Sequence, residues 1–263
     1  KPKSTGEGRF GNWLENVVDW NLSRSRFWGT PLPIWRTEEG DEEICIGSIE
    51  ELNANIRKAN EVLGGDVNKH YLHEGILDLH KPYVDDIILA SPSGKPMNRV
   101  PDLIDVWFDS GAMPYAQLHF PFENKELFAQ SYPADFIAEG VDQTRGWFYT
   151  LHAISCMMQE SIQEQMKDVP GWMPQNSPLG AGGVAYKTCV SNGLVLDKNG
   201  NKMSKRLGNV VDPFSTIETF GADATRWYLV TNASPWDNMK FDLDGIKEVQ
   251  RKFFGTLYNT YQF

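Results

Sequence analysis

A strand-like run that leads directly into a helical pattern constrains the fold of this chain more than any other feature. Residues 134–140, ADFIAEG, are short and mostly apolar. The next residues, VDQTRGWFYTLHAISCMMQ at 141–159, repeat apolar side chains at helical spacing. A strand, a tight turn and a helix start in this order are typical of open α/β sheets, which hold ligands at the carboxyl ends of their strands. We therefore expect an α/β fold with a binding site at this turn.

Three polar side chains surround the turn. Glu139 stands near the end of the apolar run, and Asp142 and Gln143 open the helical pattern. The carboxylates suit an ammonium group or ribose hydroxyls, and the glutamine amide both donates and accepts hydrogen bonds. A second interpretation is a capped helix start with a solvated acidic edge. The spacing leaves both interpretations open.

A short basic segment, NKMSKRLGN at 201–209, stands out in an acidic chain. The 263 residues include 35 Asp and Glu against 25 Lys and Arg, for a formal net charge of -10. This balance excludes a surface that coats nucleic acid without selectivity, so such a partner has to be met locally. Lysines on a glycine-flanked loop can neutralise a polyphosphate and a departing pyrophosphate. Taken alone, the charge run is more typical of a solvated surface.

The first hundred residues divide into three parts. Residues 1–9 lack periodicity and predict a flexible lead-in. A helix behind an Asn12 cap follows, and then a short buried strand at 32–35. The apolar side chains of this helix are Trp13, Leu14, Val17, Val18 and Trp20. Residues 37–100 change in character and predict an inserted module of one helix and short strands.

The last third predicts a strand that ends at a Ser-Asn-Gly turn, a second strand at 194–196, and a glycine turn at 199–200. Asp212 caps the next helix and Gly221 ends it. Residues 243–263 carry a helical stripe. The glycine-rich segment 179–185 matches no phosphate-binding motif and is interpreted as a flexible link.

Cysteine and histidine spacing argues against a metal site. Cys45, Cys156 and Cys189 lie far apart, without a CxxC pair, so ordinary buried thiols are expected. The histidines of the module, His70, His73 and His80, fit no familiar ligand spacing. No apolar run approaches the roughly 20 residues that a bilayer span needs. We expect a soluble, cytoplasmic protein with no zinc site and no membrane contact.

Several segments together resemble a known family. KMSKR at 202–206 is similar to the KMSKS signature of class I aminoacyl-tRNA synthetases, and the likeness extends over 192–213. DVWFDSG at 105–111, EGVDQTRGWF at 139–148 and SRSRFWGTPLPIW at 23–35 resemble the isoleucyl members in particular. Valyl and leucyl members differ at the segment that matches DVWFDSG. The motifs keep the family's order.

The resemblance implies roles for individual residues. The aminoacyl-adenylate site would be lined by Glu139, Gly140, Asp142 and Gln143, with Trp107 and Trp147 flanking the isoleucine side chain. Core packing is the alternative for both tryptophans. The loop over the ATP phosphates would consist of Lys202, Met203, Ser204 and Lys205, and its catalytic side chains would be Lys202 and Lys205. ATP would also be bound through Asn192, Gly193, Leu194 and Val195, where backbone groups face adenine.

The reaction implied by the resemblance has two steps. The carboxylate of isoleucine attacks the α-phosphorus of ATP, which gives isoleucyl-adenylate and pyrophosphate. A ribose hydroxyl of tRNA(Ile) then takes the acyl group. Positioning and charge stabilisation carry such a reaction, with Mg²⁺ at the phosphates. The parent protein is expected to be a monomer.

The resemblance also implies a domain plan. Residues 10–36 and 101–200 would form the second half of a split Rossmann-like nucleotide-binding domain, interrupted by a connective α+β module at 37–100. Residues 201–242 would hold the KMSKS loop and the helices after it. Residues 243–263 would be the first helix of an anticodon-binding bundle.

Three departures from the family pattern limit this interpretation. Asn192 stands where the family often has His, and Arg206 replaces the last serine of KMSKS. The HIGH-like tetrapeptide and the editing insertion are missing from these 263 residues. We therefore expect a fragment that is inactive by itself. The alternatives are a valyl or leucyl fragment, or a non-catalytic module that binds tRNA or protein on a synthetase scaffold.

Overall fold

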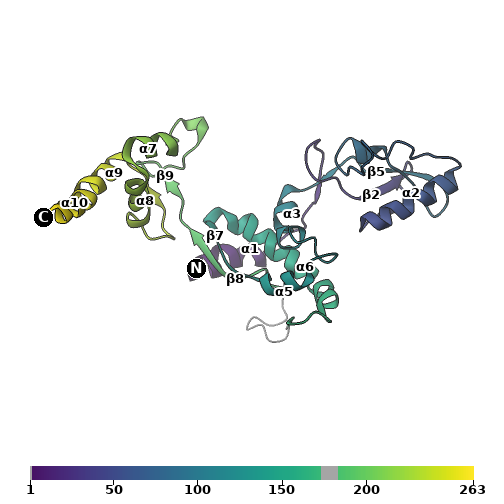
Figure 1. Ribbon diagram of the computed structural model, residues 1–263, viewed down its shortest axis with the longest axis horizontal. Helices are drawn as coiled ribbons and strands as arrows, with labels where there is room; N and C mark the ends of the chain where they lie inside the picture. The colour runs from purple at the N-terminus through teal and green to yellow at the C-terminus, as the bar shows by residue number, and fades with distance from the viewer. Residues whose placement is uncertain (1, 173–182) are drawn as a thin grey trace. The chain divides into compact units, whose positions relative to one another are not determined.

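The computed structural model describes residues 2–172 and 183–263 and has a mixed α/β fold (Figure 1). Residues 179–182 of the predicted link lie outside the described part. The chain divides into two compact units, one formed by residues 1–17 with 114–263 and the other by residues 18–113. Among the described helices, none is long and apolar enough to cross a membrane.

The unit of residues 18–113 is built on a four-stranded antiparallel sheet of order β3-β2-β5-β4. Its strands are β2 (Ile34–Thr37), β3 (Glu43–Cys45), β4 (Ile88–Ala90) and β5 (Pro96–Arg99). Buried side chains from the sheet and from α2 (Ile49–Leu63) form one core that includes Trp35, Leu52, Ile56 and Met97. This unit extends beyond the predicted module of residues 37–100 at both ends.

Local signals set the ends of α2. The Ser48 side chain accepts a hydrogen bond from the Glu51 N–H, and the Glu51 carboxylate accepts one from the Gly47 N–H. This reciprocal pair satisfies two donors that the helix start leaves without partners. Gly64 ends the helix at a φ of 78°, a conformation that favours glycine.

Outside the sheet, the same unit contains β1 (Ser23–Arg24), which pairs antiparallel with β6 (Leu103–Ile104). A 3-10 turn covers Tyr83–Asp86, and α3 spans Val106–Gly111. The short helix α4 follows at Met113–Ala116.

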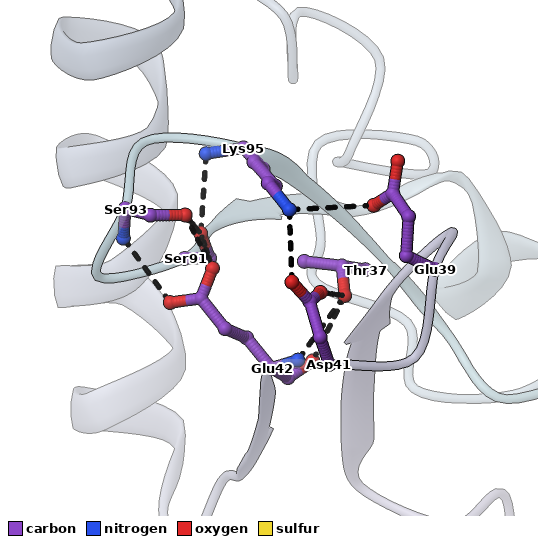
Figure 2. A network of polar contacts seen from close by, with 7 residues as sticks. All are labelled: Thr37, Glu39, Asp41, Glu42, Ser91, Ser93 and Lys95. Atoms are coloured by element: carbon purple, nitrogen blue, oxygen red, sulfur yellow. Dashed lines mark hydrogen bonds and ion pairs between the residues drawn. The ribbon is translucent and has the colours of Figure 1, made fainter.

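A polar network joins the β2–β3 turn to the β4–β5 turn (Figure 2). The Asp41 carboxylate accepts hydrogen bonds from the Thr37 hydroxyl at 2.6 Å and from the Lys95 ammonium at 2.9 Å. The neighbouring Glu42 accepts from the Ser91 hydroxyl at 2.8 Å and also from Ser93. The Thr37 hydroxyl and the Lys95 ammonium together lower the pKa of Asp41 from 3.8 to about 2.

This network predicts a pH dependence of stability. The pKa of Asp41 is lower in the folded state than in the unfolded chain. The Asp41 carboxylate therefore contributes fully to the free energy of unfolding above pH 3.8, and this contribution disappears as the pH falls through about 2. The stability difference between the wild type and Asp41→Asn should therefore shrink over this window. Urea unfolding at stepped pH measures it, with Glu38→Gln in the same turn as a control. A difference that stays constant down to about pH 2 would contradict the assignment.

In the other unit, two parallel strands and a helix form the predicted βα arrangement. Strand β7 (Ala134–Gly140) matches the predicted strand, and α6 (Trp147–Met166) leads on toward β8 (Tyr186–Asn192). The strands pair in parallel, with Ala134 opposite Tyr186 and Gly140 opposite Asn192. Buried side chains of β7 and α6 meet in a core that includes Ile137, Phe148 and Leu151. Helix α5 (Lys125–Ser131) precedes β7.

The residues after β8 form short strands and helices around a second core of the same unit. Strand β9 (Val195–Leu196) pairs in parallel with β10 (Met239–Lys240). The helices are α7 (Pro213–Phe220), α8 (Ala222–Thr231), α9 (Leu243–Val249) and α10 (Gly255–Gln262), with a π-helical segment at Gln250–Phe254. Their core includes Tyr228, Phe241 and Ile246. The Asp212 cap and the Gly221 end of α7 are confirmed.

The structure corrects the predicted start of the chain. Residues Thr5–Phe10 form a π-helical segment that continues into α1 (Gly11–Glu15), so the prediction of a flexible lead-in is wrong for residues 5–9. Tertiary contacts hold this segment, because the Arg9 side chain donates to the Thr144 hydroxyl at 2.8 Å. Asn12 lies inside the helix instead of capping it. The helix ends at Glu15, which leaves Val17 and Val18 exposed.

The strand predicted at 194–196 is confirmed as β9, and it pairs with β10, about 40 residues later, instead of with the strand before it. The prediction of buried thiols is wrong. Within the described part of the chain the three cysteines form no disulfide, but none is buried: Cys45 and Cys156 are exposed and Cys189 is half-buried. Cys45 lies on the edge strand β3 of its sheet, at a position that faces outward.

Candidate functional site

The register of β7 and β8 brings two of the predicted site segments together. Glu139 lies opposite Ser191, and Gly140 lies opposite Asn192. Because the strands are parallel, their carboxyl ends share one edge of the sheet. The turn Val141–Arg145 leaves β7 at this edge, and Gly193 follows Asn192 out of β8. The side chains of Glu139 and Asp142 are exposed there.

The turn after β7 contains the polar helix start that one of the two interpretations predicts. Gln143 caps α6, since its Oε1 accepts a hydrogen bond from the Trp147 N–H at 3.0 Å. Its Nε2 lies 3.5 Å from Asp142 Oδ2. Gly140 makes room for this carboxylate, because a Cβ at Gly140 would meet Asp142 Oδ1 at 2.6 Å. The helix cap is thus present, and the exposed Asp142 carboxylate remains for a ligand.

Thr144, Arg9 and Arg145 stabilise this turn, although the sequence did not indicate them as site residues. Thr144 is buried, and its hydroxyl donates to the Val141 carbonyl at 2.8 Å while accepting from Arg9. The Arg145 guanidinium lies 5.0 Å from the centre of the Trp13 ring, close enough for a cation–π contact. The polar residue Arg9, within the supposedly flexible lead-in, carries no local sequence signal for this role.

The two tryptophans lie in different compact units. Trp147 is partly buried against the core that contains Ile137 and Phe148, in line with the packing alternative. Trp107 is 43% exposed and belongs to the unit of residues 18–113. That the two rings flank one isoleucine side chain therefore stays a prediction.

Asp105 organises the segment that carries Trp107. Its buried carboxylate accepts hydrogen bonds from the Trp20 indole at 2.9 Å and from the Arg24 guanidinium at 2.5 Å. It also caps α3 by accepting from the Trp107 N–H at 3.1 Å. An Asp directly before an apolar helix is the signal that could have identified this cap from the sequence.

The strand before the basic loop is tightly fixed within the protein. The Gly193 N–H donates to the Pro235 carbonyl at 2.8 Å, and the Leu194 N–H donates to the Asn238 side chain at 2.8 Å. The Leu194 carbonyl accepts from the Met239 N–H at 2.9 Å. These backbone groups already have partners, which limits what remains for adenine around Val195. The sequence analysis did not identify Asn238 as the residue that holds this strand.

In the basic loop the cationic side chains are exposed, and the Met203 side chain anchors the loop. Lys202, Lys205 and Arg206 are exposed, and within the described part of the chain they form no ion pair. Met203 packs against the core of Tyr228 and Phe241, so its observed role is to anchor the loop. The Ser204 hydroxyl accepts from the Leu207 N–H at 3.2 Å and caps a 3-10 turn at Lys205–Leu207. The loop presents positive charge from a defined backbone.

The described residues offer no protein cage for a metal ion. No group of three or more His, Cys, Asp or Glu side chains in this part is placed to hold one. Mg²⁺ binds through few protein carboxylates when phosphates supply its other oxygen ligands.

Comparison with known proteins places this geometry in a family. A family model described as tRNA synthetases class I (I, L, M and V) matches residues 1–242. The chain belongs to the class I tRNA synthetases. The isoleucine–tRNA ligase of Cytophaga hutchinsonii is 66% identical to this synthetase chain over 263 residues, and that of Bacteroides fragilis is 62% identical over 278 residues. These alignments cover the whole chain but only 21% and 22% of those proteins.

Solved structures agree at the level of the fold. Agrobacterium radiobacter LeuRS, in a ternary complex with tRNA and LeuAMS, matches this synthetase chain with a TM-score of 0.59 and 20% identity. The match covers 95% of the chain and 30% of that structure. Mycobacterium tuberculosis methionyl-tRNA synthetase in complex with methionyl-adenylate matches with a TM-score of 0.51 and 16% identity. That match covers 97% of the chain and 33% of that structure.

Proposed function

We propose that the chain is part of an isoleucine–tRNA ligase, which forms isoleucyl-adenylate and pyrophosphate from isoleucine and ATP, and then transfers the isoleucyl group to tRNA(Ile) with release of AMP. The observation that carries the proposal is the parallel register of β7 and β8, which puts Glu139 and Gly140 beside Ser191 and Asn192. The two segments with the strongest family resemblance thereby share one edge of the sheet. The identity of 66% to a ligase of this name supports isoleucine as the amino acid.

In this proposal the exposed carboxylates and the basic loop have separate tasks. Glu139 and Asp142 bind the ammonium group of isoleucine and the ribose hydroxyls, as hydrogen-bond acceptors with negative charge. Lys202 and Lys205 neutralise the charge that builds up on the β- and γ-phosphates as pyrophosphate leaves. Magnesium bound to ATP supplies further positive charge there. The protein forms no covalent intermediate, so correct placement of the two substrates provides most of the acceleration.

The proposed larger assembly follows from the same resemblance. Residues 134–192 would be part of the second half of a split Rossmann-like domain, and the helices after the basic loop would lead toward an anticodon-binding bundle. By itself the 263-residue chain is proposed to be inactive, because it spans about a fifth of its relatives' length. The complete ligase is proposed to be a cytoplasmic monomer.

Isoleucine-dependent exchange of pyrophosphate into ATP by the full-length protein tests this function. We expect exchange with isoleucine, and none above background with leucine or methionine. Faster exchange with valine or leucine would favour the alternative specificities. A protein that binds tRNA but shows no exchange with any of the four amino acids would favour a non-catalytic module.

A further inference from the structure

The basic loop is attached to a tight turn that comes directly before it. Leu196 and Lys202 form an isolated antiparallel bridge that closes the turn. The Asp197 N–H donates to the Asn201 carbonyl at 2.9 Å. The Asp197 Oδ1 accepts from the N–H groups of Asn199 and Asn201 at 2.9 and 2.8 Å. This carboxylate therefore organises the whole turn with one of its oxygens.

The other carboxylate oxygen reaches across to the far end of the loop. Asp197 Oδ2 accepts a hydrogen bond from Asn209 Nδ2 at 2.9 Å. The same Nδ2 donates to the Lys202 carbonyl at 3.2 Å, and Asn209 Oδ1 accepts from the Ser204 N–H at 2.9 Å. One side-chain amide thus binds the turn before the loop and the backbone at both ends of residues 202–204. We call Asp197 and Asn209 the clasp.

The clasp acts on backbone atoms and leaves the cationic side chains exposed. Both of its residues are partly shielded from solvent, whereas Lys202, Lys205 and Arg206 are exposed. The pKa of Asp197 is lowered, chiefly by the hydrogen bond from Asn209, so the carboxylate is charged at neutral pH. A loop held in this way does not need to be ordered by its ligand, which reduces the entropy cost of placing its charges.

We propose that Asp197 and Asn209 are positioning residues that hold the backbone of residues 202–205 so that the two lysine ammonium groups meet the triphosphate of ATP. This inference rests on the proposed function, because it assigns the anion that the loop meets. It goes beyond it in naming residues outside the KMSKR signature on which the rate depends. Neither residue touches the substrate in this proposal, so their effect is transmitted through the loop backbone alone.

The test is Asn209→Ala in the full-length ligase, with Asn201→Ala as a matched control. Asn201 lies on the same turn, and its side chain makes only one contact to Asp197, at 3.4 Å. We expect Asn209→Ala to lower kcat for ATP–pyrophosphate exchange or to raise KM for ATP, for a combined loss of about tenfold to a hundredfold in kcat/KM for ATP, because small misplacement of a charged group is costly. The KM for isoleucine should stay unchanged, as should every parameter of Asn201→Ala.

A second variant and a second measurement guard against simple unfolding. Asn209→Asp keeps the acceptor for Ser204 but sets a carboxylate against Asp197, so it should lose at least as much kcat/KM for ATP as the alanine variant. Trypsin cleaves after Lys202, Lys205 and Arg206, and we expect both Asn209 variants to be cut there faster than the wild type and Asn201→Ala, at an unchanged midpoint of thermal unfolding.

The outcomes separate the two claims. A wild-type protein without isoleucine-dependent exchange contradicts the proposed function, and the clasp proposal fails with it. If the wild type exchanges pyrophosphate and Asn209→Ala behaves like Asn201→Ala, only the clasp proposal fails. An equal rise in KM for isoleucine and for ATP, or a lowered thermal midpoint, would show a general structural role and would also overturn it.

Discussion

Replacing Lys205 by alanine in the full-length ligase is expected to lower kcat for ATP–pyrophosphate exchange about a hundredfold to a thousandfold, the usual cost of removing one preorganised charge or donor at a transition state. The loop exposes this ammonium group, and Ser204 caps the turn in which it lies. Removing the side chain therefore leaves the backbone in place. In the proposed mechanism the charge that develops on the departing pyrophosphate loses a cationic partner, so the loss should fall on the transition state.

The kinetic pattern distinguishes this role from weakened binding. Transition-state stabilisation lowers kcat and kcat/KM together, whereas uniform binding changes KM alone. Lys198→Ala is the matched control, since Lys198 is an exposed lysine on the turn before the loop and lies outside the KMSKR signature. Equal losses of kcat in the Lys198 and Lys205 variants would show that the effect comes from the overall positive charge of this region and not from Lys205 in particular. An unchanged kcat in Lys205→Ala would remove this lysine from the mechanism.

Replacing Gly193 by alanine is expected to produce the largest structural effect. A Cβ at this position would lie 2.0 Å from the Asp237 carbonyl oxygen, 2.2 Å from its carbon and 2.7 Å from the Asn238 nitrogen. All three are backbone atoms, so no side-chain rotation relieves the overlap. Overpacking of this kind costs about 3 kcal/mol of local stability. The segment at 237–239 must move away, which breaks the hydrogen bond between Met239 N–H and the Leu194 carbonyl.

Hydrogen exchange of the backbone amides measures this loss of local stability residue by residue. About 3 kcal/mol corresponds to exchange that is at least about a hundredfold faster at Met239 and Phe241, whose N–H groups donate to the carbonyls of Leu194 and Leu196. Gly8→Ala is the control, because nothing lies within 4 Å of a Cβ at Gly8. Wild-type protection of both amides in Gly193→Ala would show that the chain passes this point less closely than the structure indicates.

The elements that the sequence predicts correctly have local signals. Asp212 and Gly221 mark the ends of α7, because capping depends on residues within one helical turn. Strand β7 and the helical region after it were also predicted from local patterns, a short apolar run and apolar side chains at helical spacing. These predictions need no knowledge of the rest of the chain.

The features that the sequence did not predict depend on distant partners. β9 pairs with β10 rather than with the strand before it. Residues 5–10 are helical because Arg9 and Phe10 reach the β7–α6 region, which no local pattern reveals. Asn209 resembles any polar loop residue in sequence, yet its amide makes three hydrogen bonds around the basic loop. Here tertiary contacts override local preference.

The residues of the candidate site also divide into those with a local sequence signal and those without one. Residues at the β7 turn and in the basic loop were identified from their motifs, whereas the residues that fix their backbones were not. Asn238 belongs to this second group, and its role follows only from a contact across the fold.

Amino-acid-dependent exchange of pyrophosphate by the full-length protein decides whether the site selects isoleucine. We expect isoleucine to give the highest kcat/KM and valine to have an activation free energy higher by about 1–3 kcal/mol, the worth of one methylene in an apolar pocket. Leucine and methionine should give no exchange above background. A higher kcat/KM for any of these three amino acids, or the absence of exchange with isoleucine in a folded, tRNA-binding protein, would contradict this expectation.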